Sequence, residues 1–460
     1  MIFRLTSPFP NDTLWLQWIG GFAAMIMMFV VGLTIGWASP YLAQFSTEDS
    51  PFPASVDEVS WIASIFQLGR LPGAALGFIG NQYLGSKTTM IGNGCGLMMS
   101  WILVIAANSV AWLYVARFIC GVAIEVASIS FPLYLGDISS SNIRGALIAM
   151  TLNGLSLGIL TGNIMGAYIS MRIFACISLV PTISFVLIFI LIPQSPYYLT
   201  SKSKMQDAEK SILKYNPKAN ISVEVETIKQ FVATTSAVTF IDRLREFNIP
   251  RNRKAGLTVI ILDLFAQFCG LNPIATYMET IVTRGMVTVV TPSIVPILAN
   301  GLGIVAGLLM MYLADAVGRR RMWVYSSCGV CLAMTALGTH FYLLNDGLDP
   351  KHLQWIPIIS MILFTICFNM GLNCIPAILL SELFGANIRT LAASISCAFA
   401  AVFAFTSVNS YQYLLELIDE SYIYWMYAIL MVVSAIFGLF LVPEMKGKTL
   451  KEIQDFMTEK

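Results

Sequence analysis

Long runs of apolar residues alternate with short polar or turn-rich breaks along this chain of 460 residues. A helix that crosses the hydrocarbon core of a bilayer needs about 20 mostly apolar residues. Twelve runs of about that length lie near 15–37, 58–80, 88–107, 109–136, 145–170, 172–193, 255–283, 290–314, 322–344, 353–381, 388–415 and 422–442. The pattern predicts an all-α membrane protein with twelve transmembrane helices, of which the tenth and eleventh are long enough to be tilted or bent.

The polar segments predict how the chain divides. Residues 201–254 are the one long polar insert and carry eleven Lys or Arg, which is typical of amphipathic linker helices between two halves. We expect five parts: an N-terminal segment at 1–14, a six-helix bundle at 15–200, linker helices at 201–254, a second six-helix bundle at 255–445, and a tail at 446–460.

The distribution of basic residues predicts the orientation, because loops rich in Lys and Arg stay cytoplasmic. With both termini in the cytoplasm, 22 of the 27 basic residues lie there. Three then lie outside and two within helices: Arg172, Arg284 and Lys351, and Arg70 and Arg117. The reverse orientation inverts this distribution, so we expect both termini and the linker helices to be cytoplasmic.

The composition excludes several classes of protein. Hydrophobic residues make up 57% of the chain and charged residues only 12%, against about 25% charged in a soluble domain. A net charge of +1 provides no field for nucleic acid. The two His and nine Cys show no metal-ligand spacing, and no phosphate loop or nucleophile elbow indicates an enzyme. We expect a monomer without cofactor or metal, with lipid and a small solute as its partners.

An internal repeat relates the two halves. Asn142-Ile143-Arg144 recurs as Asn387-Ile388-Arg389, and the turn at 82–87 matches that at 315–320, so the offsets are 233 to 245 residues. Such repeats are typical of secondary transporters, whose site lies between the repeats near the bilayer midplane. Charged residues recur at the predicted inner helix ends, namely Asp137, Arg144, Asp315, Arg319, Arg320, Glu382 and Arg389. They can form bidentate pairs that close a cavity on the inside, or the cations can simply anchor helices at headgroups.

Several motifs in order resemble the sugar-porter family of the major facilitator superfamily. They are Ala266-Gln267-Phe268-Cys269-Gly270-Leu271-Asn272, Pro193-Gln194-Ser195-Pro196, Val442-Pro443-Glu444-Met445-Lys446-Gly447, Arg117-Phe118, Gly318-Arg319-Arg320 and Ser381-Glu382-Leu383-Phe384. Within that family, Gln82-Tyr83-Leu84-Gly85 and Ser39-Pro40 are similar to insect facilitated trehalose and glucose transporters. The resemblance implies a carrier that works by alternating access.

The resemblance also implies a substrate site made of amides, which replace the hydrogen bonds of a sugar with water. Gln267 and Asn272 match two amides of the family, Asn369 stands at a polar or acidic family position, and Tyr277 can line the same groove. Alternatively, each amide only bonds a neighbouring helix, and Tyr277 only packs.

Other family positions differ in this chain. Small or apolar residues replace expected polar or aromatic ones at Ala38, Leu152, Ala266, Gly303, Ala377, Ala400, Ala401 and Ala404, and the first inner charge cluster is weakened by Gln82 and Ser86. Without a Trp at Ala377 a stacking platform is lost. We expect a wider and more apolar cavity than in a glucose carrier.

Three charges within the predicted helices are candidates for function, because charge is expensive in hydrocarbon. Arg70 and Glu125 lie at similar depths and can pair, as a structural salt bridge or as substrate-binding charges. Arg117, which we assign to the gating and salt-bridge set, lies two turns from Glu125 and can compete for it. Asp263 shares a helix face with Gln267 and can bond substrate hydroxyls or take a proton.

The function that follows is transport of a small sugar, hexose or trehalose, across the plasma membrane. Ala38 stands where proton symporters of the family place a carboxylate, so facilitated diffusion is expected. Two alternatives stay open: coupling to protons through Glu125 or Asp263, and a non-transporting, sensor-like relative.

Overall fold

The computed structural model of the chain describes residues 14–45, 54–217, 220–236, 240–384 and 386–442. Some side chains within helices, including those of Asp315 and Glu382, lie outside the described set. Over the described residues the chain consists of helices and their connections, with no strand.

The N-terminal helices come first along the chain. They are α1 (Trp15–Gly36), α2 (Ala38–Phe45), α3 (Val56–Tyr83), α4 (Ser86–Ala106), α5 (Val110–Ile138), α6 (Ser141–Tyr168) and α7 (Met171–Leu191). Four short helices follow as the linker: α8 (Pro196–Ser201), α9 (Met205–Tyr215), α10 (Ile221–Ser236) and α11 (Phe240–Phe247).

The C-terminal helices complete the fold. They are α12 (Pro250–Phe268), α13 (Leu271–Arg284), α14 (Ile294–Val317), α15 (Arg319–Asn345), α16 (Trp355–Cys367), α17 (Ile375–Leu383), α18 (Ala386–Leu417) and α19 (Glu420–Leu441), with a short 3-10 turn η1 (Pro350–His352) and a π turn η2 (Phe368–Leu372). The π turn bends the predicted tenth segment, whereas the eleventh is the single long helix α18.

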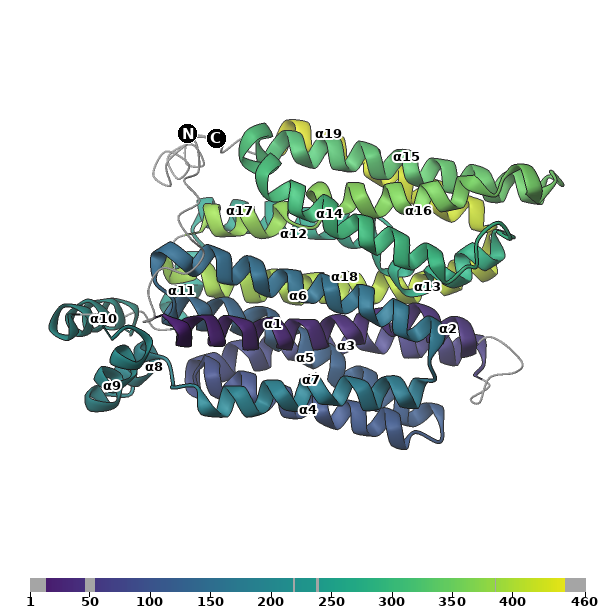
Figure 1. Cartoon of the computed structure of the whole chain (residues 1–460). Helices are drawn as coiled ribbons and strands as arrows, with labels where there is room; N and C mark the ends of the chain where they lie inside the picture. Colours follow the sequence, from purple (N-terminus) through teal and green to yellow (C-terminus); the bar gives the residue numbers. More distant parts are fainter. Residues whose placement is uncertain (1–13, 46–53, 218–219, 237–239, 385, 443–460) are drawn as a thin grey trace.

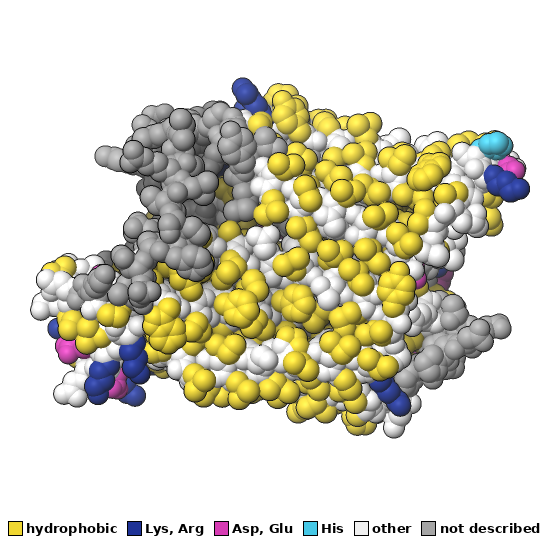
Figure 2. All heavy atoms as spheres, in the orientation of Figure 1, with side chains coloured by type: hydrophobic (Ala, Val, Ile, Leu, Met, Phe, Trp, Pro, Cys, Tyr) yellow, Lys and Arg dark blue, Asp and Glu magenta, His cyan; other side chains and the backbone are white. Residues whose placement is uncertain are grey.

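Eleven helical segments of the described chain are long and apolar enough to cross a membrane, and a shorter apolar helix, Ile294–Met310, supplies the remaining segment. The predicted twelve-helix membrane fold is therefore confirmed. Large apolar side chains face outward, among them Leu191 at 84% and Phe440 at 78% exposure. In the face seen in Figure 2, apolar atoms cover the middle and charged side chains gather at the two ends.

The long helices run side by side, and α8–α11 gather at one end of them, which we call the linker end (Figure 1). Helices α2 and α13 lie at the opposite, far end. Within the N-terminal helices α1 packs on α6 and α3 on α5, and within the C-terminal helices α15 packs on α19 and α16.

The first and seventh membrane segments are both broken. Helix α1 ends at Gly36 and α2 begins after Trp37. Helix α12 ends at Phe268, and Gly270 adopts φ +92 before α13 begins. This left-handed φ is open to glycine at little cost. Trp37 and Gly270 differ by 233 positions, the offset of the sequence repeat, so the breaks occupy corresponding places in the two halves.

A close helix crossing brings α3 against α5. A Cβ added to Gly121 would lie 1.9 Å from the Phe66 carbonyl oxygen, and one added to Gly69 would lie 2.3 Å from that of Phe118. Small residues let helix backbones approach in this way in membrane proteins. The crossing places the side chains that follow Gly69 on α3 beside those that follow Gly121 on α5.

At the far end, the two groups of helices touch. Helix α2 packs on α13, and α3 packs on α18. The Glu279 backbone N–H donates to Ser39 Oγ at 3.2 Å, and the ring of Trp61 lies 6.5 Å from that of Phe405. These contacts close the far end between the N-terminal and C-terminal helices.

The linker is anchored to the N-terminal helices. Ser195 Oγ donates to Asp137 Oδ2 at 2.6 Å and accepts from the Tyr198 N–H, which starts α8. Tyr215 Oη donates to the Pro193 carbonyl at 2.8 Å, and the Gln17 amide donates to the Tyr215 carbonyl at 2.9 Å. Burial raises the pKa of the Tyr215 phenol, so this hydroxyl stays protonated.

Candidate solute-binding site

A cavity of about 330 Å³ lies between the N-terminal and C-terminal helices. Its walls are mainly apolar, with side chains such as Phe66, Ile159, Phe364 and Phe368. Amides and two arginines interrupt this surface: Gln67, Asn163, Gln267, Asn272, Asn300, Asn369, Asn373, Arg70 and Arg117. An apolar pocket with a few placed polar groups is the usual form of a small-molecule site.

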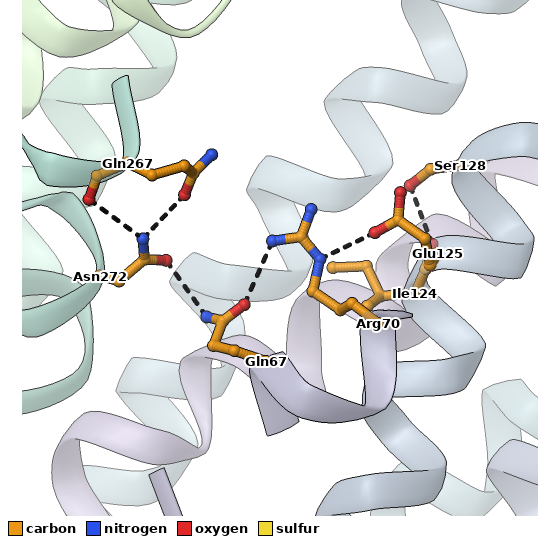
Figure 3. Close-up of polar contacts among 7 residues, drawn as sticks. All are labelled: Gln67, Arg70, Ile124, Glu125, Ser128, Gln267 and Asn272. Carbon is orange, nitrogen blue, oxygen red and sulfur yellow. Dashed lines mark hydrogen bonds and ion pairs between the residues drawn. The ribbon is translucent and has the colours of Figure 1, made fainter. Parts of the chain in front are cut away.

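A continuous chain of hydrogen bonds runs through this cavity (Figure 3). Arg70 Nη1 donates to Gln67 Oε1 at 3.1 Å, and Gln67 Nε2 donates to Asn272 Oδ1 at 3.1 Å. Asn272 Nδ2 then donates to Gln267 Oε1 at 2.8 Å. The chain crosses from α3 to the break between α12 and α13, so it joins the two halves.

The arginine at one end orients every amide in the chain. A guanidinium has only donors, so Gln67 must turn its oxygen toward Arg70 and its nitrogen toward Asn272. Because the Asn272 oxygen accepts from Gln67, its nitrogen must point toward Gln267. The NH₂ group of Gln267 remains, with no partner among the described residues, as a donor for a solute.

Arg70 and Glu125, two of the charges within the predicted membrane helices, form an ion pair. Arg70 Nε lies 2.8 Å from Glu125 Oε2, and the Glu125 side chain is only 2% exposed. The structure therefore confirms that these two residues pair. Arg70 lines the cavity and Glu125 does not, so the carboxylate holds the arginine from behind.

Arg117 does not compete for Glu125. Its Nη1 donates to the Thr34 carbonyl at 2.6 Å, and its guanidinium lies over the rings of Trp37 and Phe66, at 5.1 and 4.4 Å from their centroids. The Thr34 carbonyl, in the last turn of α1 before the break at Trp37, takes the hydrogen bond instead.

Of the four predicted substrate residues, three line the cavity. Gln267 and Asn272 belong to the amide chain, and Asn369 bonds the Thr365 carbonyl of its own helix at 2.9 Å. Tyr277, expected in the same groove, is instead buried away from the cavity. Its ring stacks on Tyr411 of α18 with centroids 5.8 Å apart, because the backbone of α13 is kinked at Tyr277 itself (φ −114, ψ 17).

Asp263 also points elsewhere than its helix face predicts. Its carboxylate accepts a hydrogen bond from Ser396 Oγ on α18, and it does not line the cavity, unlike Gln267 one turn later. Asp263 still interacts electrostatically with Arg70 and Glu125. Asp263, Glu125 and Arg70 thus form one group of charges, of which only Arg70 lines the cavity.

The predicted inner charges with described contacts bind groups near them at the linker end. Asp137 accepts from Ser195, Arg144 donates to the Ser139 carbonyl at 3.2 Å, and Arg389 donates to the Phe384 carbonyl at 3.3 Å. Of the remaining members, Arg319 and Arg320 begin α15, and the side chains of Asp315 and Glu382 lie outside the described residues. No ion pair between described residues links the halves at the linker end.

The expected wide cavity is not seen in this conformation. Its volume lies at the low end of the roughly 300–1,000 Å³ of small-molecule sites. Ala266, Ala401 and Ala404 are buried in helix contacts rather than exposed to the cavity. Gly303 does line it, and a Cβ there would lie 3.0 Å from Asn369 Nδ2, so this glycine makes room for the amide.

Sequence reasoning missed Gln67, the residue that connects the two halves. One signal was available: Gln67 precedes Arg70 by three positions and so shares its face on α3. Asn163 of α6 was missed as well, although an amide within an apolar run tends to face a cavity or the bundle interior.

Comparison with known proteins agrees with this architecture. A family model described as "Sugar (and other) transporter" matches residues 19–456. The chain is 28% identical to the facilitated trehalose transporter Tret1 of Bombyx mori, covering 98% of this chain and 90% of that protein. It is also 28% identical to Tret1 of Apis mellifera ligustica, covering 95% and 88%.

Solved structures show the same fold. The proton:xylose symporter XylE bound to 6-bromo-6-deoxy-D-glucose superimposes with a TM-score of 0.75, at 20% identity over 97% of this chain and 100% of that one. The inward-open conformation of XylE from E. coli gives a TM-score of 0.77, at 20% identity over 95% and 98%. The family match over almost the whole chain shows that the protein belongs to the sugar transporter family, and its fold is that of XylE, a protein of the major facilitator superfamily.

Proposed function

We propose that this protein carries a small sugar across the plasma membrane by alternating access and facilitated diffusion. The observation that carries the proposal is the amide-lined cavity at the two corresponding helix breaks, between halves that the repeat relates. In transporters built from repeats, the solute site lies at this place. We assign one bundle to 15–200 and the other to 255–445, with linker helices at 201–254 between them.

The linker end is the cytoplasmic side in this proposal, together with both termini. The segment from α8 to α11 carries Lys202, Lys204, Lys210, Lys214 and Arg245, and basic segments stay in the cytoplasm. The far end, which faces outward, is closed by the contact of Ser39 with Glu279. We therefore infer that the structure is an inward-facing state.

The charged residues at the inner helix ends pair with one another in the outward-facing state. Asp137, Arg144, Arg319, Arg320 and Arg389 stand at the linker end, where Arg144 and Arg389 donate to nearby backbone carbonyls in this conformation. When the outer end opens and the inner end closes, these groups can pair across the halves, as can Asp315 and Glu382.

The cavity size favours a single sugar ring. A cavity of about 330 Å³ lies near the lower limit of small-molecule sites, which suits one hexose better than a disaccharide. The relatives are named as trehalose transporters, so trehalose is the competing substrate. It requires the cavity to widen in another conformation.

Coupling to protons is the second candidate, favoured by the buried carboxylates Glu125 and Asp263 near the cavity. XylE is described as a proton symporter. Here Ala38 lines the cavity near Arg117, and Glu125 is already paired with Arg70. Uptake into vesicles with and without an imposed pH gradient separates the two: facilitated diffusion predicts equal final accumulation, and symport predicts accumulation driven by the gradient.

The deciding experiment is uptake of radiolabelled glucose and trehalose by oocytes that express the chain. We expect Gln267→Ala and Asn272→Ala to reduce uptake at least tenfold with normal surface expression. Asn153→Ala is the matched control, because this amide bonds the Ala149 carbonyl of its own helix and does not line the cavity. Equal uptake by all variants would place the site elsewhere, and no uptake above water-injected oocytes would favour a sensor-like protein.

A further inference from the structure

The cavity contains a buried cation without a counter-ion. Arg117 is 5% exposed, lines the cavity, and its Nε has no hydrogen-bond partner among the described residues. No described carboxylate lies within 4 Å of it. An unpaired charge in a site of this kind is strongly disfavoured unless something compensates it.

The compensation that is present is incomplete. The Thr34 carbonyl belongs to the last turn of α1, and a helix C-terminus supplies about half of a negative charge. The rings of Trp37 and Phe66 add a cation–π attraction. Arg70 differs, because Glu125 neutralises it at 2.8 Å. Of the two cavity arginines, Arg117 is the one whose charge no described carboxylate neutralises.

Gln267, in the remaining polar lining, also offers a donor. Arg70 orients the amide chain so that the free group of Gln267 is its NH₂. Glu125 and Asp263 do not line the cavity. A solute therefore meets donors at both Arg117 and Gln267 and no carboxylate among the described lining residues, which suits a group that only accepts hydrogen bonds.

The space for such a group lies beside Ala38. Thr34 and Ala38 are four positions apart at the kink of the first segment, and Ala38 lines the same cavity as Arg117. The alanine methyl neither fills this corner nor supplies an acceptor. A carboxylate there can accept from the guanidinium of Arg117 in a charge-assisted contact.

We propose that the preferred solute is a sugar acid, a monosaccharide whose carboxylate binds Arg117 while its hydroxyls meet Gln267 and the neighbouring amides. The inference rests on the proposed sugar-carrier function and names the class of sugar. Discrimination follows from the site itself, because a neutral sugar leaves the Arg117 donors unpaired. Sites with unpaired buried polar groups reject analogues that lack the matching group.

Equilibrium binding of D-glucuronate and D-glucose tests this, because the two differ only in the oxidation of C6. The full chain is purified into nanodiscs, and displacement of each radiolabelled sugar is measured. We expect glucuronate to bind at least 30-fold more tightly than glucose. In Arg117→Gln the two sugars should bind about equally, mainly because glucuronate binds more weakly. Arg172→Gln is the control for loss of a positive charge, because Arg172 lies in the first turn of α7 and does not line the cavity.

Ala38→Asp provides a second, independent variant. It supplies Arg117 with an internal carboxylate, so glucuronate should lose its advantage while glucose binding persists. This variant keeps the test decisive if Arg117→Gln does not fold. Glucose binding as tight as glucuronate binding in the parent would overturn the sugar-acid inference and leave the carrier proposal standing. Binding of neither sugar would also overturn the sugar-acid inference, whereas the carrier proposal is overturned only if trehalose uptake is absent as well.

Discussion

Gln67 Nε2 lies 3.1 Å from Asn272 Oδ1 and donates a hydrogen bond to it across the interface between the two halves of the molecule. Gln67 belongs to α3 and Asn272 to the start of α13. The bond connects the buried ion pair of Arg70 and Glu125 to the amides that face the cavity (Figure 3). Orientation of the solute site therefore depends on an ion pair whose carboxylate lies outside the cavity lining.

Replacing Gln67 with Leu should disturb the cavity amides. Arg70 and Asn272 each lose a partner, and a buried polar group left unpaired costs about 1–3 kcal/mol. Because Asn272 is then free to rotate, we expect the KM for sugar uptake to rise about tenfold with a smaller change in maximal rate. Asn153→Leu, which removes an amide outside the cavity, should leave KM within twofold; an equal rise in both variants would contradict the role of Gln67.

The Arg70 and Glu125 pair should behave as a unit in a double-mutant cycle. Removing one partner leaves a buried charge, and such changes cost about 3–5 kcal/mol. Arg70→Met and Glu125→Leu should each lower the unfolding temperature strongly, whereas the double variant should recover most of the loss. The comparison pair, Lys210 with Asp207, is exposed with N–O 4.0 Å apart and should show no measurable coupling. If the losses of the two single variants simply add in the double variant, Arg70 and Glu125 do not act as a unit.

Gly303→Val should narrow the cavity. A Cβ at this position already comes within 3.0 Å of Asn369 Nδ2 and 2.8 Å of Thr365 Cγ2, so a larger side chain displaces Asn369 or fills the site. We expect sugar uptake to fall more than tenfold while surface expression remains. Gly301→Val on the same helix meets no atom within 4 Å and should retain uptake. Similar losses in both would indicate a general effect on α14.

Ser195→Ala should loosen the linker from the N-terminal helices. The substitution removes the bond to Asp137 and the N-terminal cap of α8, and loss of a cap alone costs about 1 kcal/mol. Hydrogen exchange of residues 196–215 should accelerate severalfold, with exchange in α3 and α5 unchanged. Ser201→Ala removes only a bond to the Tyr198 carbonyl within α8 and should have little effect on α9. Unchanged exchange in Ser195→Ala would mean that Asp137 does not anchor the linker.

Much of the architecture could be predicted from the sequence. Apolar runs, basic loops and repeated motifs are local features, and the bilayer converts them directly into spans and an expected orientation. The pairing of Arg70 with Glu125 followed from their similar depths, and the cavity positions of Gln267 and Asn272 followed from the resemblance of one motif.

Only the tertiary structure decided which way the remaining side chains face. Tyr277 turns to Tyr411, Asp263 turns to Ser396, and Arg117 takes the Thr34 carbonyl because helix breaks and crossing angles set the rotation of each face. Gln67 gains its partner from a residue 205 positions away. Spacing along one helix specifies which residues share a face, but the packing of the other helices determines what that face meets.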